Sequence, residues 1–259
     1  MLTRSGPSQE SDRKMSETQN IPWMRIAVEA AAIVGSILLA FAIDAWWDNY
    51  QDRAAEQRIY VGLKSEFEQN LELIEIELSY RNAVIDSIVE IFDASVAPNS
   101  LEPEVLDGLI GDLTWWQNIK YSRGAIDGLL QSGELSLIEN EDLRRDLASM
   151  PSRYDDTAAS ELYDQYTTLN VIIPFLNTHS SLSQIANTAK GRPGTGKELA
   201  PPAYPVGKPQ DHSGLLRDPE FLGILVQEHW NHLGAISAYE SLKASLENSI
   251  RLIDSEMNN

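Results

Sequence analysis

Apolar side chains follow one another without a polar face over residues 26–43. Glu29 is the only charged residue in that stretch, and Ser36 is the only polar side chain between residues 30 and 43. Eighteen helical residues measure about 27 Å, close to the roughly 30 Å of a bilayer's hydrocarbon core. A core helix of a soluble domain would keep a polar face toward water. The pattern therefore predicts a transmembrane helix over residues 22–47, after a polar, disordered tail over residues 1–21.

Aromatic residues stand at both ends of the predicted span. Trp23 stands at one end, and Trp46, Trp47 and Tyr50 stand at the other. Such residues anchor a span in the two interfacial regions of a bilayer. A signal peptide is the competing interpretation of the apolar run, but Ala40-Phe41-Ala42 continues directly into more apolar sequence with no suitable cleavage site. We therefore expect an uncleaved anchor.

A helical apolar stripe continues after the span. No proline occurs between residues 23 and 97, and apolar residues recur there at spacings of three, four or seven, with Glu and Asp expected largely on the opposite face. The stripe consists of Ile59, Leu63, Phe67, Leu71, Ile74, Leu78, Ile85, Ile88 and Phe92. The span should thus continue as a helical stalk to about residue 93.

The rest of the chain also predicts helices, and no segment shows the alternation of a strand. One helix begins at Pro103, and another follows a cap at Ser122. A third begins at Asn140 and ends near Met150, and a fourth runs from Tyr154 to a kink or end at Pro174. Residues 178–214 form a long irregular loop, with five prolines and five glycines between Lys190 and Leu215. Asp218 and Pro219 then start a last helix over residues 219–257.

These elements predict an all-α protein. Its soluble part, residues 48–259, comprises the stalk and a helical bundle with the 178–214 loop. The stalk and the last helix should pack antiparallel, with Leu63, Phe67 and Leu71 on one side and Leu246 and Ile250 on the other.

Charge excludes one class of partner. The chain has 20 basic and 39 acidic residues, a net charge of −19. Such a surface repels nucleic acid and anionic lipid headgroups, so nucleic-acid binding is not expected. The chain has no cysteine, which leaves its redox compartment open.

The charged residues of the span and three of its small residues fall on one helical face. At about 100° per residue this face holds Arg25, Glu29, Ala32, Ser36, Ala40 and Asp44. Small side chains let helices approach closely in lipid, so the face predicts docking of a second copy or of another integral membrane protein. The alternative is that Glu29 and Asp44 simply sit in the two headgroup regions while Arg25 snorkels.

The orientation of the span follows from a small excess of positive charge. Four basic residues precede the span or lie at its start, and three follow it within twenty residues of Asp44. The positive-inside rule then predicts a cytoplasmic N-terminus and a C-terminal domain in the periplasm, or outside the cell.

Two motifs suggest chemistry, and neither is complete. The segment GRPGTGKE, residues 191–198, matches a phosphate-binding loop, but it lacks the flanking strand and helix and has Glu198 where Ser or Thr would hold magnesium. In EHWNH, residues 228–232, His229 and His232 share a helical face, but Glu228 precedes both histidines and no third ligand is evident. Polar seam residues that fix helix register are the simpler explanation. We predict no cofactor, metal or catalytic residue.

Two stretches resemble an uncharacterised family of bacterial single-span membrane proteins. The first is EAAAIVGSILLAFAIDAWWDNYQDRAAEQRIYVGLKSEF, whose Glu29, Asp44, Trp46 and Tyr60 stand at matching places, with a small departure at residues 61–62. The second is GAIDGLLQSGELSLIENEDLRRDL, residues 124–147; DPEFLGILVQEHWNHL is similar more weakly. The resemblance implies an inner-membrane protein with a helical soluble domain and implies no reaction.

Three functions remain as hypotheses. The first is a non-enzymatic, membrane-anchored scaffold or an accessory subunit of a membrane complex. The second is an enzyme or metal-binding bundle that uses His229 and His232. The third is a ligand sensor whose 178–214 loop acts as a lid.

Overall fold

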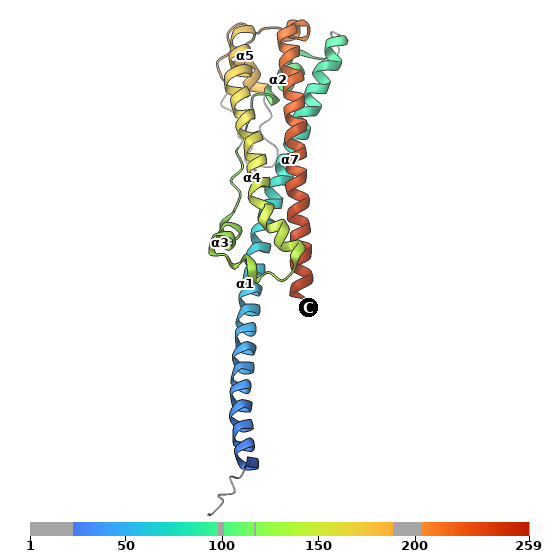
Figure 1. The fold of residues 1–259 in the computed structure, drawn as a ribbon. Helices are drawn as coiled ribbons and strands as arrows, with labels where there is room; N and C mark the ends of the chain where they lie inside the picture. The colour runs from blue at the N-terminus through green and yellow to red at the C-terminus, as the bar shows by residue number, and fades with distance from the viewer. Residues whose placement is uncertain (1–22, 98–100, 117, 189–203, 259) are drawn as a thin grey trace, which may run out of the picture. The chain divides into compact units, whose positions relative to one another are not determined.

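The computed structural model describes residues 23–97, 101–116, 118–188 and 204–258, which divide between two compact units, residues 1–52 and 53–259. Every regular element in the described residues is helical, as predicted (Figure 1). The helices are α1 (Trp23–Val96), α2 (Pro103–Asp112), α3 (Gly124–Ser132), α4 (Glu141–Thr167), α5 (Ile173–His179), α6 (Leu182–Thr188) and α7 (Pro219–Met257), with short turns η1 (Glu134–Leu137), η2 (Thr168–Ile172) and η3 (His212–Arg217). The tail predicted over residues 1–21 lies outside the described residues.

The predicted span and stalk belong to one helix. No proline interrupts α1, which ends at Val96, three residues beyond the expected end. Its first part contains an apolar segment long enough to cross a membrane. From Glu56 onward one side of the helix is buried, because residues at spacings of three and four face the other helices of the second unit.

Helices α1 and α7 pack antiparallel in the second unit, as predicted. The Lys64 ammonium lies 2.5 Å from Asp254 Oδ1, and the Lys243 ammonium lies 3.0 Å from Glu75 Oε1. As residue numbers increase along α1, the numbers of the residues that they contact on α7 decrease, so the two helices run antiparallel. The expected apolar contacts also form: Leu63, Phe67 and Leu246 are fully buried in one cluster, with Leu71 and Ile250 partly buried against it.

Helix α4 completes a three-helix bundle and runs parallel to α1. Asn70 donates a hydrogen bond to the Tyr154 hydroxyl at 2.8 Å, and Arg81 contacts Asp164 at 2.6 Å, so positions rise together along the two helices. Two apolar clusters fill the bundle. The first core cluster is centred on Tyr60, Leu63, Phe67 and Ile74 of α1.

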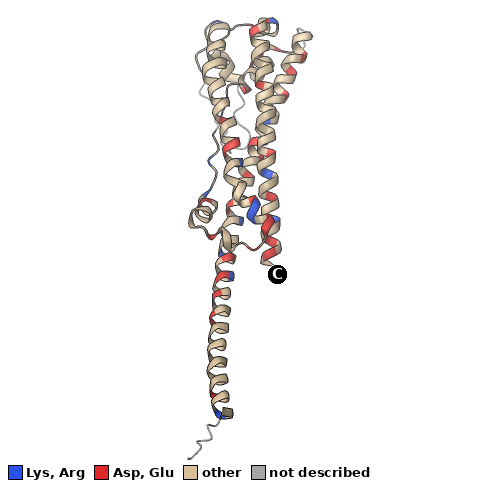
Figure 2. Ribbon diagram, viewed as in Figure 1, with Lys and Arg blue, Asp and Glu red and all other residues tan. Residues whose placement is uncertain are grey.

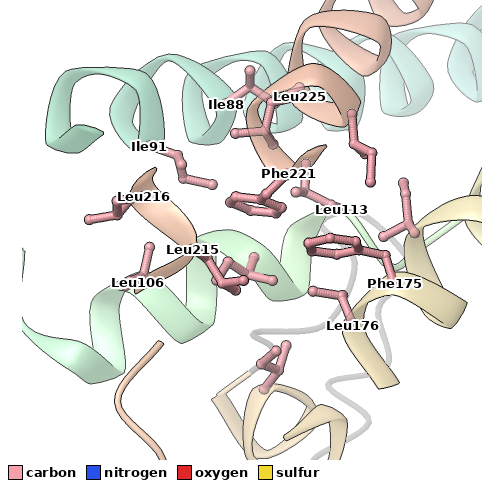
Figure 3. Packing of buried hydrophobic residues seen from close by; sticks show 14 of the residues in the cluster. Ile88, Ile91, Leu106, Leu113, Phe175, Leu176, Leu215, Leu216, Phe221 and Leu225 are labelled. Atoms are coloured by element: carbon pink, nitrogen blue, oxygen red, sulfur yellow. The ribbon is translucent and has the colours of Figure 1, made fainter. Parts of the chain in front are cut away.

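The second core cluster lies where α1, α2, α5, α6, η3 and the start of α7 meet. Figure 3 shows Phe175 facing Phe221, with Leu176, Leu215 and Leu225 around them. The two phenyl rings stack with centroids 5.8 Å apart and an interplanar angle of 11°. Short helices thus cover the end of the bundle that three long helices alone would leave open.

The start of α3 corrects a predicted cap. We expected Ser122 to cap this helix, but it begins at Gly124 and no side chain within the segment caps it. Instead the Glu66 carboxylate of α1 accepts hydrogen bonds from the Ala125 and Ile126 amides at 2.7 and 3.1 Å. A carboxylate at a helix N-terminus satisfies free N–H groups and interacts favourably with the helix dipole. A distant residue therefore takes the capping role.

Two prolines lie inside continuous helical stretches, and the first of them contradicts the prediction. The helix expected to end near Met150 continues through Pro151, because Leu147, Met150 and Tyr154 all belong to the first core cluster and packing there holds one helix together. Near Pro174 the chain forms a π-helical turn, η2, before continuing as α5. The wider turn accommodates the missing proline N–H without ending the helix.

The predicted 178–214 loop is only partly irregular. Helix α6 lies inside it, and the turn η3 begins before its end, while residues 189–203 lie outside the described residues. Ile185 explains the helix: its side chain is fully buried in the second core cluster. The start of α7 agrees with the prediction, since Asp218 accepts hydrogen bonds from the Glu220 and Phe221 amides and Pro219 follows it.

Candidate functional site

The face predicted to dock another helix is exposed along its whole length. All of residues 23–50 are exposed, including Arg25, Glu29, Ala32, Ser36, Ala40 and Asp44. Arg25 Nε lies 3.0 Å from Glu29 Oε1, so the expected pair forms. The Ser36 hydroxyl donates to the Ile33 carbonyl at 2.8 Å and so presents little polarity outward. Docking on this face stays a prediction.

The aromatic residues after the apolar segment form a group of their own. The rings of Trp46, Trp47 and Tyr50 lie within 6.3 Å of one another, centroid to centroid, and all three side chains are at least half exposed. Trp23, the first residue of α1, is also exposed. Large amphipathic rings exposed together suit the headgroup region of a bilayer.

A layer of charged residues crosses the interior of the bundle between the two apolar clusters. On α4 and α7 it falls between the residues of the two core clusters, and on α1 it lies where the first cluster gives way to the second, on either side of Tyr80. We call it the polar layer; its members are Glu77, Arg81, Glu161, Asp164, Glu228 and His232. Each of these residues is classed as buried, which is unusual for charged side chains unless they are paired.

Arg81 is the centre of the polar layer. Its side chain is 1% exposed and contacts Glu77 at 3.1 Å and Asp164 at 2.6 Å. It also lies 3.4 Å from Nδ1 of His232, and its guanidinium carbon lies 5.0 Å from the centre of the Tyr239 ring. One cation therefore holds carboxylates from α1 and α4 and a ring from α7, the geometry for which an arginine fork is suited.

Glu161 ties a connecting segment to the same layer. Its carboxylate accepts a hydrogen bond from the Tyr239 hydroxyl at 2.6 Å and one from the Ile119 amide at 3.0 Å. Burial raises the pKa of Glu161, and these two donors oppose the rise. Burial likewise raises the pKa of Asp164 against the opposing charge of Arg81.

The pKa values of Glu228 and His232 are shifted far from the ordinary values of these side chains. Burial, reinforced by the charge of Asp164, raises the pKa of Glu228 to about 7. Burial and the neighbouring Arg81 lower the pKa of His232 to about 3. His232 is thus neutral at physiological pH, and Glu228 exchanges a proton in that range. The layer has one permanent cation among four carboxyl groups.

The structure separates the two histidines that the sequence places on one face. His232 is buried against Arg81, while His229 is only partly buried. A cation next to His232 repels a metal ion, and the described ranges contain no group of three or more potential metal ligands. The interpretation of His232 as a polar residue of the helix seam fits its position.

Sequence reasoning missed the other members of the polar layer. We expected Glu and Asp of α1 on the solvent face, yet Glu56, Glu66 and Glu77 are all buried. Glu56 accepts hydrogen bonds from the Tyr60 hydroxyl and the Glu139 amide. The signal was present in the spacing, because Glu77 and Arg81 continue the buried register between Ile74 and the next apolar residues.

A second buried pair fixes the segment that follows residues 189–203. His212 Nδ1 lies 2.6 Å from Asp107 Oδ1, and His212 Nε2 accepts a hydrogen bond from the Ser181 amide at 3.1 Å. Gln184 donates to the other Asp107 oxygen at 2.7 Å. Since both ring nitrogens of His212 are engaged, no lone pair is left to activate a nucleophile. The pair fastens η3 to α2 and α6.

A hollow of about 630 Å³ lies beside that pair, lined largely by hydroxyl and amide side chains from residues 177–186, Tyr204 and Gln210. None of the described residues that line it is charged. The ligand-sensor hypothesis stays a prediction, because most of its proposed lid lies outside the described residues. The same holds for GRPGTGKE, residues 191–198.

Comparison with known proteins adds no assignment. No protein-family model, no curated protein and no solved structure matches the chain. The resemblance of the anchor and of residues 124–147 to an uncharacterised membrane family therefore stays an expectation.

Proposed function

We propose that the protein is a non-enzymatic, single-pass membrane protein that acts as a scaffold or as an accessory subunit of a membrane complex. One observation carries the proposal. The first part of α1 contains an 18-residue window with a mean hydropathy of 2.4, and none of that window is buried. A large exposed apolar surface is unfavourable in water and requires another environment, at about 25 cal/mol for each Å².

Membrane insertion has a direct test. In cell fractionation the parent chain should remain in the membrane pellet after alkaline carbonate washing. Replacing Ile37 and Leu38 by arginine places two charges at the centre of the segment, at a cost of about 2.5–3.5 kcal/mol each. This variant should move to the soluble fraction, whereas Val61→Arg with Val89→Arg, outside the segment, should not. A parent chain found in the soluble fraction would refute the anchor.

The proposed location is the bacterial inner membrane, with a cytoplasmic N-terminus and a periplasmic C-terminal domain. The distribution of basic residues supports this orientation. A reporter that is active only in the periplasm, fused after Asn259, should be active. Activity of a cytoplasm-only reporter at the same point would reverse the orientation.

The absence of catalysis is part of the proposal and rests on how the buried groups are used. Arg81 is shared among acidic and aromatic partners, and Glu161 is occupied by Tyr239 and Ile119. Groups so engaged are poorly placed to bind a substrate. Metal analysis of purified protein tests the enzymatic alternative: stoichiometric zinc or iron that is lost with His229→Ala and His232→Ala would overturn our proposal.

The face of the anchor helix is proposed to bind a second span. Ser36→Leu with Ala40→Leu should weaken crosslinking to partner spans in membranes without preventing insertion, because leucine blocks close approach. Ala27→Leu with Ala31→Leu, on the opposite side of the helix, is the matched control. Unchanged crosslinks in the first variant would place docking elsewhere. Purification in mild detergent should identify the co-eluting subunits.

A further inference from the structure

One surface of the bundle has almost no charge in a strongly acidic chain. Residues 165–188 contain no Asp, Glu, Lys or Arg, and neither do residues 221–227 and 229–239 of α7. Three acidic residues near these stretches, Glu161, Asp164 and Glu228, are buried in the polar layer. Figure 2 shows η2 and α5 in tan, without red or blue.

Large apolar side chains are exposed on this surface. They come from α4 and α7, and we call them the α4–α7 face: Tyr163, Tyr166, Val226, Trp230 and Leu233. Trp230 is 69% exposed and Tyr166 is 61% exposed. Gln227 donates to the Tyr163 hydroxyl at 2.7 Å, which shows that the two helices meet here. Exposed tryptophan and tyrosine with few charges are typical of the centre of a protein interface.

A groove runs between the two helices beside Trp230. It measures about 350 Å³, and small residues, among them Ala159, Ser160 and Gly234, make much of its lining. Trp230 stands at its edge, one helical turn before Gly234. The face therefore has both a projecting ring and a recess of the kind that receives one.

We propose that the α4–α7 face is the contact between two copies of this chain, with Trp230 of each copy inserted in the groove of the other. A two-fold contact requires this reciprocity, since the same patch serves both partners. The α4–α7 face supplies both halves of the contact. The contact is separate from the span-to-span docking described above.

Charge argues for a second copy as the occupant. Two chains of net charge −19 repel each other through most orientations. An uncharged face is where two such copies approach at the least electrostatic cost. A basic partner would gain more by binding the acidic faces of the bundle, because complementary charge guides such encounters.

The available area is sufficient. A stable interface buries about 800 Å² on each side. An aromatic side chain supplies roughly 150–250 Å² when fully buried. Two largely exposed aromatic side chains, the 43% exposed Tyr163 and two aliphatic side chains, together with the lining of the groove, therefore supply on the order of the area that a specific dimer needs. Anchoring in a membrane, which rests on the proposed function, raises the local concentration further.

The experiment uses engineered crosslinks, for which the chain is suited because it has no cysteine of its own. Leu233→Cys should form a disulfide between two copies in native membranes under mild oxidation. Val89→Cys is the matched control and should stay monomeric, because Val89 lies on α1 and is 45% exposed, against 47% for Leu233. No crosslink at residue 233, or equal crosslinking at both positions, would overturn the proposal.

A second measurement follows the mass of the full-length protein in mild detergent. The parent should be a dimer, and Trp230→Glu with Tyr166→Glu should be at least tenfold weaker in self-association, with unchanged helix content. A monomeric parent, or a variant that stays dimeric, would overturn the proposal. So would a dimer lost in Ser36→Leu with Ala40→Leu but retained in the Trp230→Glu variant. Membrane fractionation of the same samples reports separately on the anchor.

Discussion

The two parts of helix α1 present opposite solutions for an apolar helix surface. Over residues 23–50 every side chain is exposed and the apolar residues surround the helix. Over residues 53–96 most apolar residues keep to one side, which packs against α4 and α7. Both parts contain an Arg–Glu pair four residues apart, Arg25–Glu29 and Glu77–Arg81, but one is exposed and the other is 1% exposed on both side chains.

The comparison shows that the period of the apolar residues, more than their number, determines what a helix contacts. A narrow stripe fits a protein neighbour of defined register. An apolar surface on all sides has no such neighbour within the chain and fits lipid. The same holds for polar residues. A polar residue within the buried stripe needs a partner inside the protein, whereas the polar residues of the uniformly apolar segment lie mainly near its two ends.

The largest contrast should come from one phenylalanine in each part. Phe67→Ala removes a fully buried ring from the first core cluster and should lower the free energy of unfolding by about 3–5 kcal/mol. Phe41→Ala changes a ring that is 65% exposed and should leave it unchanged. Urea unfolding of full-length protein in mild detergent, followed by circular dichroism, measures both. Equal losses would show that the first part of α1 is also packed against protein, which would contradict the comparison.

Arginine gives a similar contrast through charge. Arg81→Ala leaves Glu77 and Asp164 buried without their cation and should cost about 3–5 kcal/mol in the same assay, because an unpaired buried charge is strongly unfavourable. Arg58→Ala, at an exposed position of α1, is the control and should have little effect.

A compensating variant sharpens the Arg81 test. Arg81→Met combined with Glu77→Gln and Asp164→Leu removes the cation together with both contacting carboxylates, and should recover most of the lost stability. If the combined variant is as unstable as Arg81→Ala, the loss comes from packing rather than from uncompensated charge.

The polar layer should also make stability depend on pH. Glu228 faces Asp164, Arg81, Thr167 and Asn231, and its pKa is raised to about 7 from about 4.5. The folded state therefore binds a proton that the unfolded state has released between these values. Its stabilising effect is complete below about pH 4.5 and is lost as pH rises through 7, an effect of roughly 3 kcal/mol.

Glu228→Gln isolates this effect from the titration of the acidic surface. Glutamine resembles the protonated acid, so the variant should match the parent at pH 5 and exceed its stability at pH 8. Glu240→Gln, at an exposed position of the same helix, should run parallel to the parent at both pH values. A Glu228 variant that runs parallel as well would mean that Glu228 is ionised throughout.

The sequence predicts the parts of this fold that depend on local pattern. The helical continuity of α1, the antiparallel packing against α7 and the cap at Asp218 follow from periodicity and cap chemistry. The capping of α3 by Glu66 does not, since the two segments are 59 residues apart and only the packed bundle brings them together. Continuation through Pro151 has the same cause: burial of its neighbours outweighs the local preference of proline.

The polar layer marks the limit of such prediction. A glutamate or arginine in a helix is assigned to the solvent face because burying a charge without a partner is costly. Whether a partner exists depends on the other two helices: Asp164 and His232 reach Arg81 from segments 83 and 151 residues away. The sequence can show that a charged residue occupies a position on the buried side of its helix. Whether that charge has a partner is known only once the packing of the other helices is known.

The smallest effect should come from the other Arg–Glu pair of α1. Arg25 and Glu29 have side chains 78% and 62% exposed, and their contact joins only neighbouring turns of one helix. Arginine also precedes glutamate here, the less favourable order for the helix dipole, whereas Glu77 precedes Arg81. Exposed pairs of this kind often contribute nothing measurable, because water and salt screen both charges. Arg25→Ala should therefore leave urea unfolding unchanged at both 20 mM and 500 mM salt. A stability loss comparable with that of Arg81→Ala would mean that residues 23–50 have a protein partner that covers this pair, and the contrast between the two parts of α1 would then be one of partner identity rather than of solvent.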